Sequence, residues 1–507
     1  MAIHSLPFEI LVEIFRLCFV NEALPIYPDP YGESGPSTHP HAAANTFPPP
    51  HVCKLWRNIC SSSPQLYTTL SLRYEVGRET EMTPVSQNAR LCTFLALTAP
   101  HPISVSFIIT TKEGIDEKWY DVPEETLLAY GHESGLLRLL EHKTRWKSAT
   151  ISIPSPFLRL FFPEELTYPR LEKLDLHVYA FPNEKRGVKK MVTKVFEPIY
   201  WPNLRVITLQ RDLARVLMFT DWRSGGSRIQ VLILYGACIE NENLGVLSAC
   251  ESLHTIHFTS CFTLPSYDPD LSAKRTLLPN VNTVSCSRLL PSDVRATPLA
   301  FLILPRLQHL QIQWNEALEE EVVGLSERSG FELKSLTLIQ VPRSVYRPPT
   351  EQFISLLTRL SRIKSINQGL AGLELNHTDA KWDICEFVEL MKVLSLGGLD
   401  DTHYTLFPFL KELTIAAYSI PDNAAFIAML ESRQQCPVST IPLVQKIEQP
   451  LGLQTLRLRC PKSTFHAETM AYFGKLSGEG KKLYFEPWVG VTQKKWTVWN
   501  HQSYEVD

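Results

Sequence analysis

The chain has 507 residues, of which 44% are hydrophobic and 20% are charged, an ordinary composition for a globular protein. Its 50 Lys and Arg nearly balance 53 Asp and Glu, so the net charge is −3 at pH 7. This balance argues against nucleic acid or a membrane surface as the main partner. A length of this order predicts two to four domains or one long repeat array.

The cysteines and the N-terminal residues predict an intracellular protein. Eleven cysteines are scattered without a C-x-x-C pair, and Cys238, Cys250 and Cys286 lie in apolar runs, as reduced cysteines do. The first residues lack the pattern of a signal peptide, and no apolar run is long enough to cross a bilayer. The basic run 185–194 is either a nuclear-import signal or a solvated loop. We therefore expect a cytoplasmic protein, with the nucleus as the alternative compartment.

Two short amphipathic helices are expected near the N-terminus, over 6–18 and 52–60. Ser5 can cap the first helix, and a segment rich in Pro, His, Ala and Gly separates the two. Such short helices must bury their apolar sides against each other and against something else. The apolar residues at helical spacing are Leu6, Ile10, Leu11, Ile14, Phe15 and Cys18 in the first helix, and Val52, Trp56, Ile59 and Cys60 in the second.

The residue order in these helices resembles the F-box. Residues 6–15 read Leu-Pro-Phe-Glu-Ile-Leu-Val-Glu-Ile-Phe, residues 52–56 read Val-Cys-Lys-Leu-Trp, and residues 64–67 read Pro-Gln-Leu-Tyr. The resemblance covers residues 5–70 and implies binding to the small adaptor subunit of SCF-type (cullin-based) ubiquitin ligases. The residues that it implies for adaptor binding are Leu6, Pro7, Ile10, Leu11, Ile14, Phe15, Val52, Cys53 and Trp56.

The chain departs from the usual F-box in two ways. The gap from Phe15 to Val52 is more than twice the usual one, and residues 46–50, Thr-Phe-Pro-Pro-Pro, stand where a leucine-rich helix normally lies. Part of the usual docking surface is thus missing or supplied differently. The alternative interpretation is that both helices cap a repeat array.

From residue 171 the pattern L-x-x-L-x-L returns ten times, with Ile, Val, Phe or Cys as substitutes. Between the starts at 204 and 333 the spacings are 25, 24, 28, 26 and 26 residues, which is typical of leucine-rich repeats, and later spacings widen to 37, 40 and 43. The matches are Leu171/Leu174/Leu176, Leu204/Ile207/Leu209, Ile229/Leu232/Leu234, Leu253/Ile256/Phe258, Val281/Val284/Cys286, Leu307/Leu310/Ile312, Leu333/Leu336/Leu338, Leu370/Leu373/Leu375, Leu410/Leu413/Ile415 and Leu453/Leu456/Leu458.

This pattern predicts short strands that bury alternate residues against neighbouring units, with helical returns over 350–361 and 422–433. The Asn/Cys position after the strand is filled only by Cys261 and Asn315, which predicts an irregular array. Earlier strands are expected at Tyr67/Leu70/Leu72, Ile103/Val105/Phe107 and Ile151/Ile153, with a helix over 124–146. An aromatic, alternating segment over 483–499 predicts a closing β-hairpin.

The combined order resembles a large class of fungal F-box proteins with irregular leucine-rich repeats. Arg145-Trp146 before a strand, and 327–330 (Glu-Arg-Ser-Gly) before another, are similar to that class. The resemblance implies an α/β fold in which a helical F-box precedes a leucine-rich-repeat-like solenoid, or horseshoe. The expected domains are an F-box at 1–70 with an insertion at about 21–50, an irregular linking region at 71–165, and the solenoid with its C-terminal cap at 166–507.

Catalytic chemistry is not expected. The segment 478–481, Gly-Glu-Gly-Lys, fails the spacing of a phosphate-binding loop, and His254 and His257 are expected on the surface rather than as an acid–base pair. His39, His41, His51 and Cys53 are weak zinc candidates because Cys53 belongs to the apolar side of a helix. We therefore expect no enzyme, no metal and no cofactor.

Two functions remain open: a substrate receptor of an SCF-type ligase, reaching a cullin through the adaptor, and a repeat scaffold attached to no ligase. In both, the residues between the leucines on the strand face would bind an unknown target protein. Ile233, Tyr235, His257 and Gln311 are the predicted contacts, with Ile233 and Tyr235 as anchors. The other residues of that kind are Asp175, Thr208, Ser285, Thr337, Glu374, Thr414 and Arg457.

Overall fold

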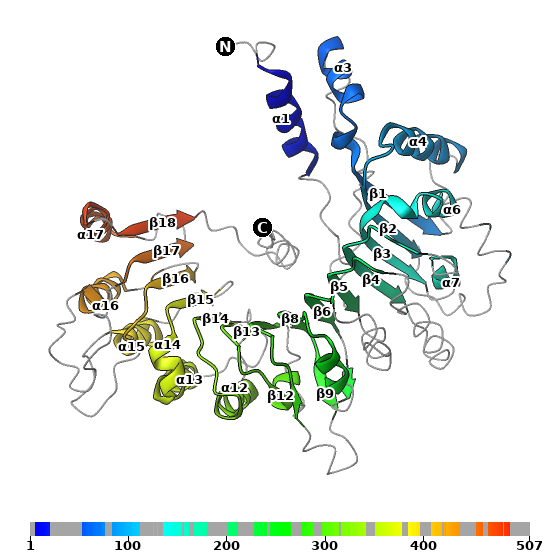
Figure 1. The fold of residues 1–507 in the computed structure, drawn as a ribbon. Helices are drawn as coiled ribbons and strands as arrows, with labels where there is room; N and C mark the ends of the chain where they lie inside the picture. The colour runs from blue at the N-terminus through cyan, green and yellow to red at the C-terminus, as the bar shows by residue number, and fades with distance from the viewer. Residues whose placement is uncertain are drawn as a thin grey trace. The chain divides into compact units, whose positions relative to one another are not determined.

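A computed structural model gives the fold of the chain (Figure 1). The structure describes residues 6–20, 53–76, 84–111, 125, 129, 135–154, 157–161, 167–179, 201–210, 228–236, 238–240, 244–264, 275–287, 297–313, 316–340, 350–377, 384–395, 407–417, 420, 422–434, 453–459, 465–479 and 481–486.

The chain forms two compact units. Unit 1 contains Met1–Leu232, Ala249–Ser252 and Lys494–Asp507, and unit 2 contains Ile233–Ser248 and Leu253–Gln493. Strand β6 (Val231–Tyr235) and the 3-10 helix η9 (Gly245–Ala249) lie at the division.

Unit 1 is built on parallel strands that pair in chain order, from β1 to β5. The helices α4, α6 and α7 lie on one side of these strands (Figure 1). Its strands are β1 (Thr69–Val76), β2 (Ile103–Thr111), β3 (Trp146–Pro154), β4 (Lys173–Tyr179) and β5 (Val206–Gln210). Its helices are α1 (Phe8–Val20), α3 (Lys54–Ser62), η2 (Pro64–Tyr67), α4 (Pro84–Leu97), α6 (Leu136–Leu140), η4 (Lys143–Arg145) and α7 (Leu158–Phe161).

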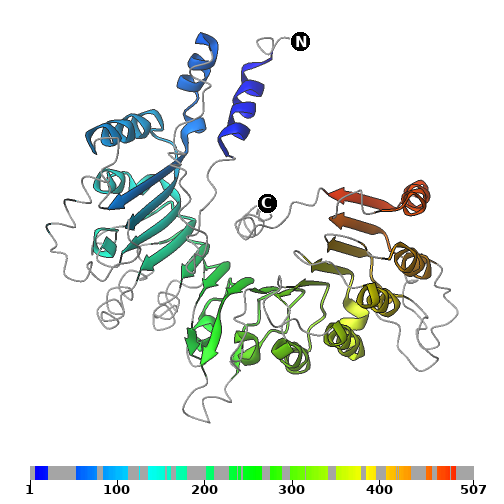
Figure 2. The ribbon, with the colours of Figure 1, turned by 180° about the vertical axis from the view of Figure 1, so that it is seen from behind.

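Unit 2 repeats the same arrangement with parallel strands from β8 to β18 in chain order. Its helices lie on one side of the strands (Figures 1 and 2). The strands are β8 (Thr255–Thr259), β11 (Thr283–Ser287), β13 (His309–Gln313), β14 (Ser335–Gln340), β15 (Gly372–His377), β16 (Glu412–Ala417), β17 (Thr455–Arg459) and β18 (Lys482–Glu486), and two short parallel pairs join β7 (Cys238–Glu240) to β9 (Phe262–Leu264) and β10 (Thr276–Leu277) to β12 (Leu302–Ile303). The helices are η10 (Pro298–Phe301), α12 (Glu316–Ser329), α13 (Thr350–Arg362), α14 (Lys364–Gly369), α15 (Ile384–Leu394), α16 (Asn423–Gln434) and α17 (Ala467–Gly478).

The leucine pattern places the strands. All ten predicted matches end in a strand, and both return helices form, as α13 and α16. The residue that opens each match is at most 7% exposed, so it belongs to the apolar core together with the two residues on the strand. These ten buried residues are Leu171, Leu204, Ile229, Leu253, Val281, Leu307, Leu333, Leu370, Leu410 and Leu453.

The three earlier strands are also confirmed, as β1, β2 and β3. The helix expected over 124–146 is wrong at its C-terminal end, because Trp146 opens strand β3. The Trp146 side chain is fully buried, with its ring 6.5 Å from Phe161 and 5.5 Å from Tyr168. Packing of this large ring in the sheet core overrides the helical spacing of the preceding leucines.

Arginine side chains connect consecutive repeats by donating hydrogen bonds to main-chain carbonyl oxygens. Arg145 donates from Nε to His101 O at 3.0 Å. Arg328, near the end of α12, donates from Nε to Leu302 O at 2.8 Å. Arg433, near the end of α16, donates to Leu394 O at 2.6 Å. Each arginine satisfies carbonyls from an earlier part of the array, as buried backbone requires.

The segment 327–330 ends helix α12 through one further hydrogen bond and one special backbone conformation. The Ser329 hydroxyl accepts from Leu304 N at 2.9 Å, a residue of the preceding repeat. Gly330 has a φ of 63°, the left-handed conformation that ends a helix without a Cβ clash. Together with Arg328, these residues end one return helix and attach it to its neighbour.

We expect Arg433→Met to lower the free energy of unfolding of unit 2 by about 3 kcal/mol, because two buried carbonyls lose charged donors. Arg433 is 2% exposed and also donates to Phe407 O at 3.1 Å, where Phe407 has a left-handed φ of 49°. Urea unfolding followed by circular dichroism measures the change. The control is Arg362→Met on the exposed side of α13, expected within about 0.5 kcal/mol of wild type. Equal midpoints for both variants would contradict the fastening role.

Candidate protein-binding surfaces

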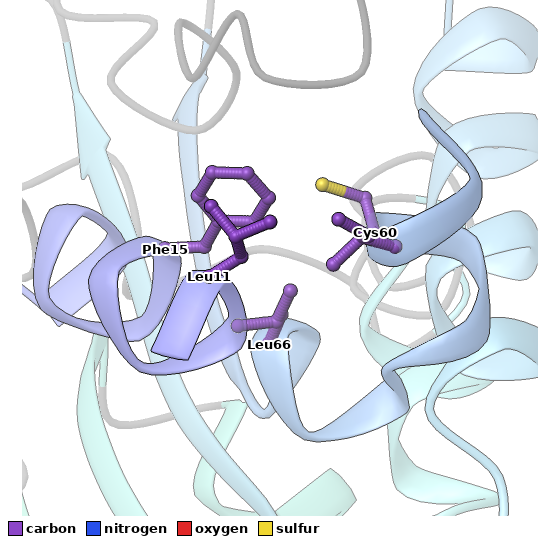
Figure 3. Packing of buried hydrophobic residues seen from close by; sticks show 5 residues of the cluster. Leu11, Phe15, Cys60 and Leu66 are labelled. Carbon is purple, nitrogen blue, oxygen red and sulfur yellow. The ribbon is translucent and has the colours of Figure 1, made fainter. Parts of the chain in front are cut away.

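The N-terminal helices α1 and α3 and the turn η2 share one small apolar core in unit 1. Its buried residues are each at most 5% exposed, and four of them are labelled in Figure 3. Phe15 also meets the Trp56 ring, with centroids 4.8 Å apart. Cys53 caps the N-terminus of helix α3, and its Sγ accepts a hydrogen bond from Trp56 N at 3.5 Å. The buried members are Leu11, Phe15, Ile59, Cys60 and Leu66.

The residues predicted to bind the adaptor are therefore divided between buried and exposed positions. Leu11 and Phe15, at 2% and 1% exposed, form the contact between the helices and are not available as an adaptor surface. This corrects their assignment. Leu6, Ile14 and Trp56 are partly buried against the same core, whereas Pro7 and Ile10 are exposed. Val52 and the insertion at 21–50 lie outside the described residues.

Two exposed apolar side chains on these helices were not predicted. Phe8 is 46% exposed and Leu55 is 41% exposed, beside Ile10 at 49%. Helical spacing places Phe8 near Leu11. The spacing alone therefore could not show that Leu11 packs into the core while Phe8 stays exposed. One feature of the sequence indicated these exposed residues. The apolar residues of α1 extend around more of the helix than a single short partner helix can cover.

The second surface is the strand face of unit 2 opposite its helices. We define it as the row of residues that lie in register across β13 to β18 and alternate with buried leucines. Every member is half-buried or exposed, and Tyr484 is 42% exposed. The row consists of Gln311, Thr337, Glu374, Thr414, Arg457 and Tyr484.

Charged and aromatic groups are concentrated at the β15–β18 end of this face. Arg459 forms an ion pair with Glu374 at 2.6 Å, and their side chains are 19% and 27% exposed. Thr337 also donates to Glu374, at 3.4 Å. The Arg457 guanidinium lies over the Tyr484 ring, 4.8 Å from its centroid, in a cation–π contact. These contacts hold the longest side chains of the face in fixed positions.

The predicted target contacts differ in accessibility. Ile233 and Tyr235, on β6, and Gln311, on β13, are half-buried. His257 was expected on an open face, and this is wrong: the side chain is 5% exposed, and burial lowers its pKa to about 4. The same expectation is wrong for three other residues between leucines, Asp175, Thr208 and Ser285, which are at most 4% exposed. These four buried residues therefore do not belong to the strand-face surface.

Several residues considered as candidates for metal binding or catalysis can be placed in the structure, and others cannot. They contain no group of three or more His, Cys, Asp or Glu placed to hold a metal ion. His39, His41 and His51, the basic run 185–194, and the part of the predicted hairpin after 486 fall outside the described ranges. Within those ranges, no helix is both long and apolar enough to span a membrane. His254, half-buried, donates to or accepts from Thr255 Oγ1 at 2.9 Å.

The chain matches no protein-family model and no curated protein. It is similar to TLR13 in a complex with ssRNA13, with 12% identity, 62% of this chain covered and a TM-score of 0.26. It is similar to mouse RP105 in complex with MD-1, with 11% identity, 75% covered and a TM-score of 0.22. It is also similar to the Drosophila Toll–Spatzle complex, with 13% identity, 77% covered and a TM-score of 0.25.

These neighbours are leucine-rich-repeat proteins, and this chain spans 38%, 59% and 51% of their lengths. The repeat architecture of this chain follows from the strand register and the buried leucines described above.

Burial of His257 predicts a pH dependence of stability. Its folded pKa of about 4 lies below the ordinary value of 6.5, so between these pH values the unfolded chain binds a proton that the folded chain does not. The stability is fully present above pH 6.5 and falls as the pH drops toward 4. We expect His257→Gln to remove about 3 kcal/mol of this loss.

Urea unfolding at pH 7.5 and pH 4.5 measures this effect. The matched control is His466→Gln, at the exposed start of α17, which we expect to keep the wild-type pH dependence. If the two variants behave alike, His257 is accessible to protons in the folded chain.

Proposed function

We propose that the protein is a substrate-receptor subunit of an SCF-type ubiquitin ligase. In this proposal the helices α1 and α3 bind the small adaptor subunit, and through it a cullin. The strand face of unit 2 binds a target protein. Ubiquitin would be transferred by another subunit, so this chain needs no catalytic residue.

Two observations together support the proposal: the F-box-like order of the residues, and the packing of these residues into one core. The segments that contain Leu11, Cys60 and Leu66 come from the opening, middle and end of the motif and share one core (Figure 3). That core leaves Phe8, Ile10 and Leu55 exposed, so these apolar side chains are available for contact with a partner. The same chain supplies a strand array suited to binding a second protein.

A repeat scaffold without a ligase is the second candidate. It is favoured by the burial of Leu11 and Phe15, because helices that use these residues for their own core can serve simply as an end cap. The long gap between Phe15 and Val52 favours it as well. The two functions differ in one property, the binding of the adaptor.

Adaptor binding is tested most directly with Ile10→Glu. Ile10 is 49% exposed, so the change should leave the helix core intact while placing a charge on the docking surface, where its desolvation is costly. We expect co-purification of the full chain with the purified adaptor to fall by about tenfold or more. Ile14→Glu should also abolish binding, but this side chain packs against the core and its loss has a structural component.

The matched control is Leu97→Glu on α4, where the leucine is 40% exposed and outside the proposed docking surface. This variant should bind the adaptor like wild type. Wild-type chain that fails to bind the adaptor at all would favour the scaffold. Equal binding by wild type and Ile10→Glu would show that the adaptor, if bound, docks elsewhere.

A further inference from the structure

The strand face of unit 1 opposite its helices carries a regular grid of hydroxyl groups. In each of the strands β1, β2 and β3, two consecutive outward positions are Ser or Thr. The residues that alternate with them point into the core on the helical side, where the Phe107 ring lies 5.9 Å from Phe161 of α7. We call the six outward residues the hydroxyl grid. Strand pairing places them in two rows, with Thr69, Ser104 and Ser148 in one row and Ser71, Ser106 and Thr150 in the other.

The hydroxyl grid is accessible to a ligand. Its two members on β1 are exposed, and its four members on β2 and β3 are half-buried. The row that contains Thr150 continues in register through Asp175 to Thr208. Thr208 Oγ1 is buried and has no hydrogen-bond partner in the part of the chain that the structure describes. This row therefore keeps hydrogen-bonding capacity that the fold itself does not use.

The grid contains neither a charged nor an apolar side chain. The next strand, β4, adds Lys173 and Asp175, whose opposite charges attract each other and leave the face neutral. A charged ligand therefore gains no ion pair from the grid. An apolar ligand would bury hydroxyls without partners, which is costly. Because each hydroxyl both donates and accepts a hydrogen bond, the matching ligand is neutral and rich in hydroxyl groups, which is the chemistry of a carbohydrate.

The spacing of the grid restricts the shape of the ligand. Neighbouring strands lie about 4.8 Å apart, whereas an extended peptide that crosses them repeats every ~6.7 Å and falls out of step. A helix repeats every ~5.4 Å, which is closer, but it docks through an apolar stripe that the grid cannot receive. In a β-1,4-linked chain of hexoses each sugar advances by nearly one strand spacing. Successive sugars of such a chain can therefore meet successive strands.

We propose that the hydroxyl grid binds an extended, neutral β-1,4-linked glycan that lies across β1, β2 and β3. One sugar lies over each strand, and its hydroxyl groups exchange hydrogen bonds with the two grid residues of that strand. This inference goes beyond the proposed function, because it uses neither the α1–α3 surface nor the strand face of unit 2.

The test measures glycan binding to the full-length chain by saturation-transfer difference NMR. The probes are the hexamers of β-1,4-linked glucose and of β-1,4-linked N-acetylglucosamine, which distinguish two neutral sugars with the same linkage. We expect saturable binding of at least one of them. The α-1,4-linked glucose hexamer, whose chain curves instead of extending, should bind about tenfold more weakly or not at all.

Thr150→Val tests the hydroxyl itself, because valine nearly keeps the shape and strand preference of threonine and removes one hydrogen bond. We expect about fivefold weaker binding of the hexamer. The matched control is Thr414→Val, a half-buried threonine at an outward position of β16 in unit 2, which should leave the affinity unchanged. Ser106→Leu covers the centre of the grid and should abolish binding, and circular dichroism checks that this variant is folded.

Three results would overturn the proposal: binding of neither β-1,4-linked hexamer, equal binding of the α-1,4-linked hexamer, or equal effects of Thr150→Val and Thr414→Val. A neutral peptide of alternating Gln and Ser serves as the protein probe. If the peptide binds more tightly than either hexamer and Thr150→Val weakens it, the face recognises protein and the glycan proposal is wrong. None of these results bears on the adaptor measurement on α1, so the two proposals fail separately.

Discussion

The fold depends on the burial of leucines between adjacent strands. Each strand of the leucine pattern has two inward apolar residues. These residues are buried only when a neighbouring strand lies on each side and the connecting segment covers them. The exposure of the inward residues shows this dependence: Leu456 is 2% exposed between β16 and β18, whereas Leu483, at the end of the sheet, is half-buried. Stability therefore comes from neighbour contacts, as in other repeat arrays.

Variable repeat length creates a second requirement, which is the satisfaction of backbone groups at the turns. The regular solution is present at Cys261, whose Sγ donates to Leu234 O at 3.2 Å on the preceding strand. Elsewhere long arginine side chains reach carbonyls that a short Asn or Cys would not. Arg433 bridges residues 26 and 39 positions away, in the part of the array where the spacing is widest. A long, planar donor tolerates insertions between repeats, so the array can be irregular and still have a paired backbone.

The two candidate surfaces differ in their physical character and therefore in the partners that they suit. The α1–α3 surface presents apolar side chains on helices whose core contains only a few residues, so binding there would also stabilise the helices. The strand face of unit 2 is rigid, because ion-pair and cation–π contacts fix Arg457 and Arg459 before any partner arrives. A preorganised polar face gives specificity through charge, while an apolar helical face gives affinity through burial.

The sequence by itself determined the ten strands of the L-x-x-L-x-L pattern, the three strands before them and the two return helices α13 and α16. The reason is that alternate apolar residues in a repeating unit must all be buried on the same side of the sheet. The sequence also indicated the two N-terminal helices. It did not determine which residues of those helices remain outside: Phe8 and Leu11 share a helical spacing, yet one is exposed and the other is buried. It also placed His257 on an open face, although that side chain is buried. Accessibility is decided by segments far away in the chain, so only the tertiary structure could assign it.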